Sequence, residues 1–203
     1  EEYMKKGCYP FFQEPEFETR MRQVINTTVE VYIPKYARMT IAATQKLKKF
    51  MYYISKSVPV KINFSDMARD LELSRDELPK YLEYLEKAEL VSVLRMKANG
   101  DAIHRKMDKL YLQNSNMSYV LSGENPDTGN ARETIFYCWT KQKYDTVESP
   151  VSDFEIDGKT FEVGGRNKGK KQISNLKDAY VVKDTIEYVF DNQVPLWMFG
   201  FLY

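Results

Sequence analysis

The chain has 203 residues, of which 43% are hydrophobic and 29% charged, and its 30 lysines and arginines against 29 acidic residues leave a net charge of +1. This length can bury one large core or two modest ones, and the composition excludes a disordered tail. No apolar run approaches the ~20 residues that span a bilayer. The near-zero charge balance excludes a uniformly basic nucleic-acid binder, so any nucleic-acid surface must be a local patch.

The two cysteines and the first residues indicate the setting of the protein. Cys8 and Cys138 lie in unrelated segments. Their number and spacing predict neither a disulfide framework nor a metal knuckle, which favours a reducing cytoplasm. Residues 1–7 lack an initiator methionine and the basic, apolar and small-residue order of a signal peptide, so we expect a piece of a longer protein.

A connector and two helices are expected first. Residues 8–38 contain three prolines, which predicts an irregular connector with one short helix over 16–29. Apolar residues at helical spacing predict a helix over 40–55, with Thr40 as its cap. We expect a second helix to begin at Ser65, whose hydroxyl can accept a hydrogen bond from a backbone N–H of the first turn.

A third helix and two strands follow. Residues 74–77 read Ser-Arg-Asp-Glu, a capping box, and the apolar residues after them form one stripe that a helix would bury. Strands are predicted over 89–94 and 109–112, joined by a charged hairpin that contains Asn99 and Gly100. Three helices and then a two-stranded wing predict a winged helix-turn-helix over residues 39–113.

The charges of this region disfavour DNA reading by the third helix. Residues 75–89 carry five acids against three bases, a local charge of −2 that would repel DNA phosphates. The wing is positive and could contact a phosphate backbone without reading sequence. Its candidate nucleic-acid contacts are Arg95, Lys97, Arg105 and Lys106. The alternative is ordinary solvated charge on a docking module, with His104 simply in solvent.

Residues 114–203 change character and predict a small α/β domain. A helix is expected over 130–141, and short strands are expected over 145–148, 153–156, 160–163, 180–183 and 186–189. The apolar run at 194–203 is too short to span a membrane and is expected to pack as a terminal strand or an irregular core segment. The fold class of the whole chain is therefore predicted as α+β.

Three acidic residues of this half follow the order of a metal-dependent nuclease site. Such nucleases hold Mg²⁺ with carboxylates at strand ends and use a nearby lysine to orient water. Glu133, Asp153 and Glu162 are the candidate catalytic residues, with the last two as candidate metal ligands. Gly164 stands where the lysine of an Asp…Glu-x-Lys signature would be, which favours loss of hydrolysis unless a lysine reaches back from the next loop.

Residues 164–171 nearly spell a nucleotide-binding phosphate loop. The segment reads Gly-Gly-Arg-Asn-Lys-Gly-Lys-Lys, but Lys171 replaces the Ser or Thr that would ligate Mg²⁺. We therefore expect no ATP binding by this segment. It is either a glycine turn with solvated lysines or a basic finger aimed at phosphates. The finger would use Arg166, Lys168, Lys170 and Lys171.

Several short motifs occur in a recognisable order. They are Tyr9-Pro10-Phe11-Phe12, Tyr81-Leu82-Glu83-Tyr84-Leu85, Ala131-Arg132-Glu133-Thr134, Asp153-Phe154, Phe161-Glu162-Val163-Gly164-Gly165 and Pro195-Leu196-Trp197-Met198-Phe199-Gly200-Phe201. With these motifs the chain resembles the bacterial and archaeal AAA-like P-loop ATPases that carry an uncharacterised nuclease-like C-terminal domain.

The resemblance implies a domain organisation and a site. Residues 1–38 would connect to an ATPase domain outside this sequence, which would bind ATP and Mg²⁺, and residues 39–113 would be the winged helix. Residues 114–203 would adopt the restriction-endonuclease-like fold. Glu133, Asp153 and Glu162 match the acidic landmarks of that fold, whereas Gly164 departs from the family's Glu-Val-Lys.

Three functions are compatible with these patterns. The leading hypothesis is a non-catalytic C-terminal accessory module that contacts DNA or regulates its own ATPase domain, in the cytoplasm and away from membranes. The second is a metal-dependent nuclease that uses a migrated lysine. The third is a protein-interaction module for an unknown partner.

Overall fold

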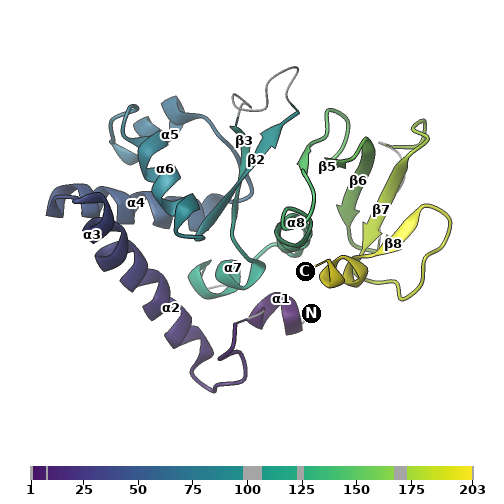
Figure 1. The fold of residues 1–203 in the computed structure, drawn as a ribbon, viewed down its shortest axis with the longest axis horizontal. Helices are drawn as coiled ribbons and strands as arrows, with labels where there is room; N and C mark the ends of the chain where they lie inside the picture. The colour runs from purple at the N-terminus through teal and green to yellow at the C-terminus, as the bar shows by residue number, and fades with distance from the viewer. Residues whose placement is uncertain (1, 8, 98–106, 123–125, 167–172, 203) are drawn as a thin grey trace. The chain divides into compact units, whose positions relative to one another are not determined.

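The computed structural model describes residues 2–7, 9–97, 107–122, 126–166 and 173–202, and it confirms the α+β class (Figure 1). Within these residues the strands form one mixed eight-stranded sheet in the order β1-β3-β2-β4-β5-β6-β7-β8. Contacts divide the chain into two units. The first holds residues 1–93 and 110–126, and the second holds residues 94–109 and 127–203.

The first unit begins with a nearly continuous helical run. After the short α1 (Glu2–Lys6), α2 (Phe17–Thr27) continues through a π-helical turn (Thr28–Tyr32) into α3 (Ile33–Ala37). The run therefore extends past residue 29, where the sequence predicted its end. Pro34 does not break it and lies in the first turn of α3, directly after the π-helical turn.

The helix α4 (Ile41–Ser57) confirms the prediction for residues 40–55. The Thr40 side chain accepts a hydrogen bond from the Ala43 backbone N–H at 3.2 Å, as expected of its cap. The apolar stripe of the helix is buried at Leu47, Phe50, Met51 and Ile54. Ile41, which shares the helical spacing, is 84% exposed because it lies in the first turn, beyond that packed stripe.

The next helix, α5 (Phe64–Leu71), is capped by a different residue from the one predicted. Asn63, and not Ser65, is the N-cap, because its side-chain oxygen accepts hydrogen bonds from the N–H groups of Ser65 and Asp66. Asparagine is among the strongest N-cap residues, so it takes this role when it precedes a serine. The α5 helix follows the short strand β1 (Val60–Lys61).

The third helix of the group, α6 (Leu78–Lys87), buries the predicted stripe at Leu78, Tyr81, Leu82 and Leu85. The capping box forms only in part. Ser74 Oγ accepts a hydrogen bond from the Asp76 N–H at 3.3 Å, and residues 75–77 form a turn, so the α-helix begins four residues after Ser74. Strands β2 (Val91–Met96) and β3 (Met107–Leu112) follow, close to their predicted positions.

The helix α7 (Ser115–Ser122) was not predicted from the sequence. Its buried first turn holds α1 through two hydrogen bonds. Ser115 Oγ donates to the Met4 carbonyl at 2.9 Å, and Asn116 Nδ2 donates to the Lys6 carbonyl at 3.1 Å. The helix has only eight residues and buries Met117 and Val120 beside these polar contacts, so its apolar repeat is too short to reveal it in the sequence.

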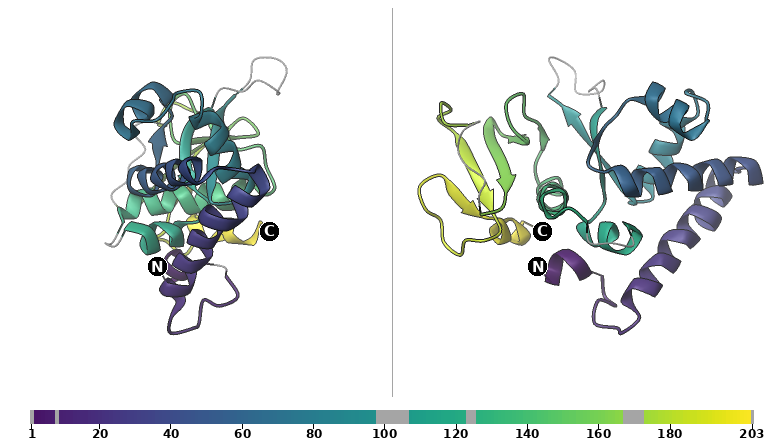
Figure 2. Two further views of the ribbon diagram at one scale, coloured as in Figure 1. Left: turned by 90° about the vertical axis from the view of Figure 1, so that its left-hand side faces the viewer. Right: turned by 180° about the vertical axis from the view of Figure 1, so that it is seen from behind.

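In the second unit, α8 (Thr128–Thr140) confirms the helix predicted over 130–141 and packs beside β6 (Figure 1, Figure 2). The fully buried Phe136 lies at its centre, with ring centroids 5.1, 5.6 and 4.7 Å from those of Phe154, Phe161 and Phe199. Asp127 caps the helix by accepting a hydrogen bond from the Asn130 N–H at 2.9 Å.

The strands of this unit combine antiparallel and parallel pairing. β4, β5 and β6 are antiparallel neighbours, whereas β6, β7 and β8 are parallel. Asp157 and Gly158 join β5 to β6 and both have positive φ, which is typical of a two-residue type I′ hairpin turn. The strands are β4 (Val147–Glu148), β5 (Phe154–Ile156), β6 (Lys159–Gly164), β7 (Ala179–Lys183) and β8 (Gln193–Pro195).

Of two predictions for the end of the chain, one is wrong and the other holds in part. Residues 186–189 form bends and not a strand, and pairing resumes only at β8. The apolar run ends in a 3₁₀ helix (Leu196–Phe201) with a buried Leu196, but Trp197, Met198 and Phe201 are exposed because the short helix packs on one side only. Among the described helices, none combines the length and the apolar character needed to cross a bilayer.

Candidate functional site

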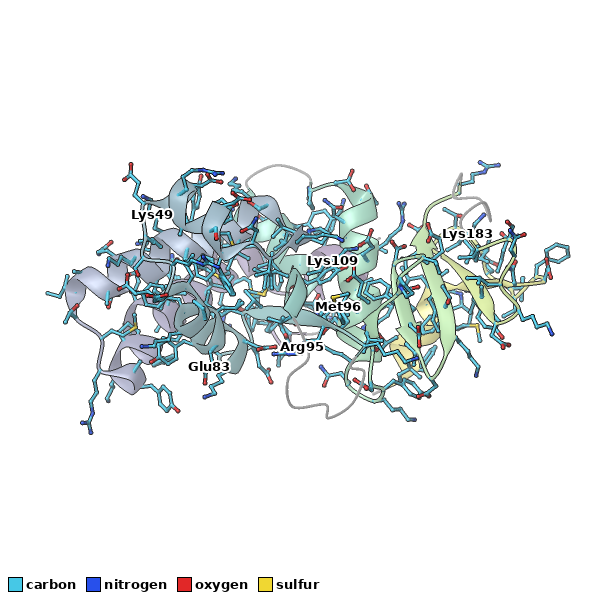
Figure 3. The ribbon with its side chains drawn as sticks, turned by 90° about the horizontal axis from the view of Figure 1, so that it is seen from above. Lys49, Glu83, Arg95, Met96, Lys109 and Lys183 are labelled. Atoms are coloured by element: carbon cyan, nitrogen blue, oxygen red, sulfur yellow. The ribbon has the colours of Figure 1, made fainter. Side chains whose placement is uncertain are left out.

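The positive wing predicted for DNA contact is described only at its base. Arg95 is half-buried and Lys97 is exposed, at the end of β2 (Figure 3). Lys97 Nζ donates to Glu155 at 2.5 Å, so an acid of β5 balances its charge. Arg105 and Lys106 lie outside the described residues, as do Asn99, Gly100 and His104. Wing contact with DNA therefore stays a prediction.

The third helix offers little free positive charge. Lys87 Nζ lies 2.6 Å from Glu83 in an i,i+4 ion pair, and this hydrogen bond raises the pKa of Lys87. At the C-terminal end of α6 an apolar groove of about 340 Å³ is lined by Tyr32, Tyr36 and Tyr84. A lysine that is paired with an acid beside an apolar groove gives no support to DNA reading by this helix.

The start of α6 is tied to α4 by a small polar cluster. Lys46 Nζ lies 2.9 and 3.1 Å from the two carboxylate oxygens of Glu77, and Tyr81 donates its hydroxyl to Glu77 at 3.2 Å. The hydrogen bond from Lys46 is the main reason that the pKa of Glu77 is lowered. Burial raises the pKa of Tyr81 to about 12, and the charge of Glu77 adds to that rise. The cluster has a structural role.

This cluster predicts a small pH dependence of stability. A carboxylate with a lowered folded-state pKa stabilises the protein above its unfolded pKa, and the contribution is lost as pH falls through the folded pKa. Because Glu77 is 35% exposed, solvent screening limits the effect to less than about 1 kcal/mol. Urea unfolding between pH 3 and 7 should show that Glu77→Gln removes this part of the acid sensitivity, and Glu83→Gln serves as the exposed control.

The acidic pair of the predicted nuclease site lies on adjacent strand ends of the second unit. Phe154 and Phe161 are paired in the β5–β6 register; Asp153 directly precedes Phe154, and Glu162 directly follows Phe161. Asp153 Oδ2 accepts a hydrogen bond from the Val163 N–H at 2.8 Å, and Ser152 Oγ donates to the Glu162 carboxylate. Glu162 is 1% exposed. The structure therefore places the two residues close together, and each carboxylate accepts a hydrogen bond from another group of the protein.

The third acidic residue does not complete a metal cluster with them. Glu133 is half-buried on α8. Within the part of the chain that the structure describes, no group of three acidic, histidine or cysteine side chains is close enough to hold a metal ion. The two-carboxylate arrangement of Asp153 and Glu162 stays a candidate, because bound water and substrate oxygens often complete a Mg²⁺ shell.

A lysine that the sequence analysis did not identify lies next to Gly164. The register of the parallel strands β6 and β7 pairs Gly164 with Lys183 and Glu162 with Val181 (Figure 3). Side chains two residues apart share a face of a strand, so Lys183 projects from the same face as Glu162. No sequence signal reveals this neighbour, because the register of two parallel strands separated by a long connection is set by tertiary packing.

The predicted basic finger is described only at its first residue. Arg166 is exposed in the turn after β6, and its carbonyl accepts a hydrogen bond from Lys183 Nζ at 3.4 Å. Lys168, Lys170 and Lys171 lie outside the described residues. The finger therefore stays a prediction, with Arg166 and Lys183 as the positive charges that the structure places at this end of the sheet.

Comparisons with known proteins give one match. A family model described as Domain of unknown function (DUF8612) matches residues 1–128, which include the helical run, the helices α4 to α7 and the first three strands. No curated protein and no solved structure matches the chain.

Proposed function

Because the chain belongs to the family described as Domain of unknown function (DUF8612), a description that names no activity, we propose a function from its residues and geometry. The chain is a non-catalytic accessory module of a cytoplasmic AAA-like P-loop ATPase, and it contacts DNA through phosphates. ATP and Mg²⁺ are bound by an ATPase domain outside this sequence, which is also its partner. The second unit has a restriction-endonuclease-like fold that has lost its chemistry.

The order of elements in the first unit carries this proposal. The chain runs α4-β1-α5-α6-β2-β3, and the first three strands are ordered β1-β3-β2. Three helices with a hairpin, and a short first strand added to the outer edge of that hairpin, are the arrangement of a winged helix. Winged helices serve as DNA-contacting or docking modules, and fold alone does not choose between these uses.

The state of the acidic pair supports the absence of catalysis. A general base or metal ligand needs a carboxylate that is open to water, metal or substrate. Asp153 instead accepts a hydrogen bond from the Val163 N–H. The Glu162 carboxylate is buried and accepts a hydrogen bond from the Ser152 hydroxyl. Gly164 also occupies the position at which the Glu-x-Lys signature has its lysine. These features favour a fold that has retained its polar residues for structure.

Phosphate contact is best supported at the end of β6 and β7. Arg166 and Lys183 meet there, and Lys168, Lys170 and Lys171 continue the same segment of the sequence. Basic side chains that touch phosphates bind DNA without reading its sequence, and the binding weakens steeply with salt. The third helix lacks this excess of positive charge, since residues 75–89 carry five acids against three bases and Lys87 is paired with Glu83.

We expect the protein to bind labelled single- or double-stranded DNA with an affinity that falls as salt rises. Arg166→Ala should weaken binding to all sequences and reduce the magnitude of the slope of log K against log salt by about one. Lys159→Ala is the matched control, since Lys159 is an exposed cation at the opposite end of β6. If no DNA binding is detected at any salt concentration, the proposed DNA contact is wrong and a protein partner is favoured instead.

The lysine beside Gly164 favours nuclease activity as a second candidate function. Lys183 projects from the face of the sheet that holds Glu162. In a nuclease it would take the place of the missing lysine of the Glu-x-Lys signature, instead of a lysine from the loop after β6. The DNA-binding reactions should therefore contain Mg²⁺ or Mn²⁺. Cleavage that disappears in Asp153→Ala and Lys183→Ala would establish the nuclease and overturn the non-catalytic proposal.

A further inference from the structure

The helical run of the first unit, which forms one rod from α2 to α3, carries two apolar stripes (Figure 1). The first stripe repeats every four residues and is buried, with contacts to α4 and α7. Its members are Phe17, Met21, Ile25, Val29 and Ile33. A second stripe repeats with the same spacing at Val24, Thr28, Tyr32 and Tyr36, so these four residues share one face of the run.

This second stripe, the tyrosine stripe, is open to solvent. Tyr32 is 63% exposed and Tyr36 is 74% exposed, and Val24 is exposed as well. Val31, one residue before Tyr32, is a further exposed apolar residue of the run. Single exposed apolar residues are common on proteins, but a row of them at helical spacing is typical of a helix that packs against another surface.

The apolar groove at the end of α6 lies beside the tyrosine stripe. Tyr32 and Tyr36 line it from the helical run, and Tyr84 and Ala88 line it from the other side. The face therefore combines a protruding row of side chains with a hollow of about 340 Å³. Helical surfaces pack by placing the ridge of one into the groove of the other, and this face offers both parts.

The charges on the two sides of the groove have opposite sign. On the α3 side Lys35 and Arg38 are exposed, and neither forms an ion pair with a residue that the structure describes. The α6 side belongs to residues 75–89, which carry five acids against three bases. Glu89, at the end of this segment, is exposed and has no ion pair within the described part of the chain.

This distribution of charge favours a second copy of the chain over other occupants. A phosphate backbone or an acidic peptide would be repelled by the acids of α6, and a basic peptide would be repelled by Lys35 and Arg38. A second copy that is related by a two-fold rotation places α3 of each chain against α6 of the other. Each basic side then faces an acidic side, and each tyrosine stripe meets the groove of its partner.

We propose that the tyrosine stripe and the groove bind a second copy of the chain across a two-fold axis. Buried aromatic side chains contribute about 150–250 Å² each, so the exposed parts of Tyr32 and Tyr36 supply on the order of 250 Å². This is about a third of the roughly 800 Å² per partner that a standard interface buries. A dimer held by a small face of this kind is reversible, with an expected Kd of about 10 μM.

Sedimentation velocity of the whole chain measures this association. The protein should be mostly monomeric at about 1 μM and mostly dimeric at about 100 μM. Tyr36→Ala should raise the Kd at least about tenfold, because a two-fold interface contains the substituted residue twice. Since Tyr36 is largely exposed, its truncation leaves the core intact.

Tyr52→Ala is the matched control for Tyr36→Ala. Tyr52 is 65% exposed on α4 of the same unit, and it does not line the groove. Its truncation should leave the Kd unchanged. A chain that stays monomeric up to about 300 μM would overturn the proposal and leave the face to a different partner. A dimer that Tyr36→Ala does not weaken would overturn it as well.

Reversal of charge tests the two-fold arrangement. Lys35→Glu and Glu89→Lys should each raise the Kd about tenfold, because each substitution places like charges opposite each other at both ends of the interface. An equimolar mixture of the two variants should regain the wild-type affinity. In the mixed dimer the new acid faces the new base, and the two native sides still face each other.

A mixture that associates no more tightly than its components would overturn the two-fold pairing of α3 with α6. The dimer goes beyond the proposed function and does not rest on it. Because the sedimentation samples contain no DNA, failure of the dimer leaves the proposed DNA contact standing, and failure of DNA binding leaves the dimer standing.

Discussion

Phe136→Ala should lower the free energy of unfolding of the second unit by about 3–5 kcal/mol. Phe136 is fully buried on α8, and its ring meets three aromatic rings from β5, β6 and the C-terminal 3₁₀ helix. Truncation removes this apolar area and leaves a cavity between elements that cannot close without moving the sheet.

The two tryptophans make this measurement selective. Trp139 and Trp197 both belong to the second unit, so their fluorescence in urea follows that unit. Phe201→Ala is the matched control, because Phe201 is 79% exposed and its recorded ring contact is with Trp197. It should change stability by no more than about 0.5 kcal/mol. Equal losses in the two variants would show that Phe136 is not the centre of this core.

Local signals carried the sequence predictions that the structure confirms. The helix at 40–55 was predicted from Thr40 and an apolar stripe, and both operate in the fold. The predicted position of α8 was equally close, because Ile135, Phe136 and Trp139 lie on its buried side. The strand predicted over 186–189 failed for the opposite reason. Its alternating pattern is local, yet Tyr188 is 79% exposed and no neighbouring strand accepts the segment.

The candidate sites were less predictable because they depend on distant pairings. Asp153 and Glu162 were predicted together, since they flank a paired position of one short hairpin, where Asp153 accepts a hydrogen bond from the N–H of Val163. Lys183 reaches Gly164 only through the register of two parallel strands, and the groove of the first unit forms where α3 meets α6. Neither arrangement follows from spacing or composition. Only the packed fold brings these side chains together.

The other large effect is expected at Gly7, where α1 meets α7 in the first unit. Gly7 has φ +65°, and an added Cβ would lie 2.1 Å from Asn116 Nδ2. Gly7→Ala must therefore displace the buried Asn116 amide and break its hydrogen bond to the Lys6 carbonyl. Left-handed strain of about 1–2 kcal/mol and an unsatisfied buried group of about 1–3 kcal/mol predict a loss of about 2–5 kcal/mol.

Hydrogen exchange read by mass spectrometry distinguishes this mechanism from backbone strain alone. In Gly7→Ala the amides of α1 and the first turn of α7 should exchange faster, because their shared hydrogen bonds open. Gly158→Ala is the matched control, since Gly158 has φ +77° and nothing lies within 4 Å of the added Cβ. It should lose only the strain term of about 1–2 kcal/mol. If the free energy of unfolding falls equally in both variants, the Asn116 side chain moves aside without cost. The contact between α1 and α7 would then not stabilise the first unit.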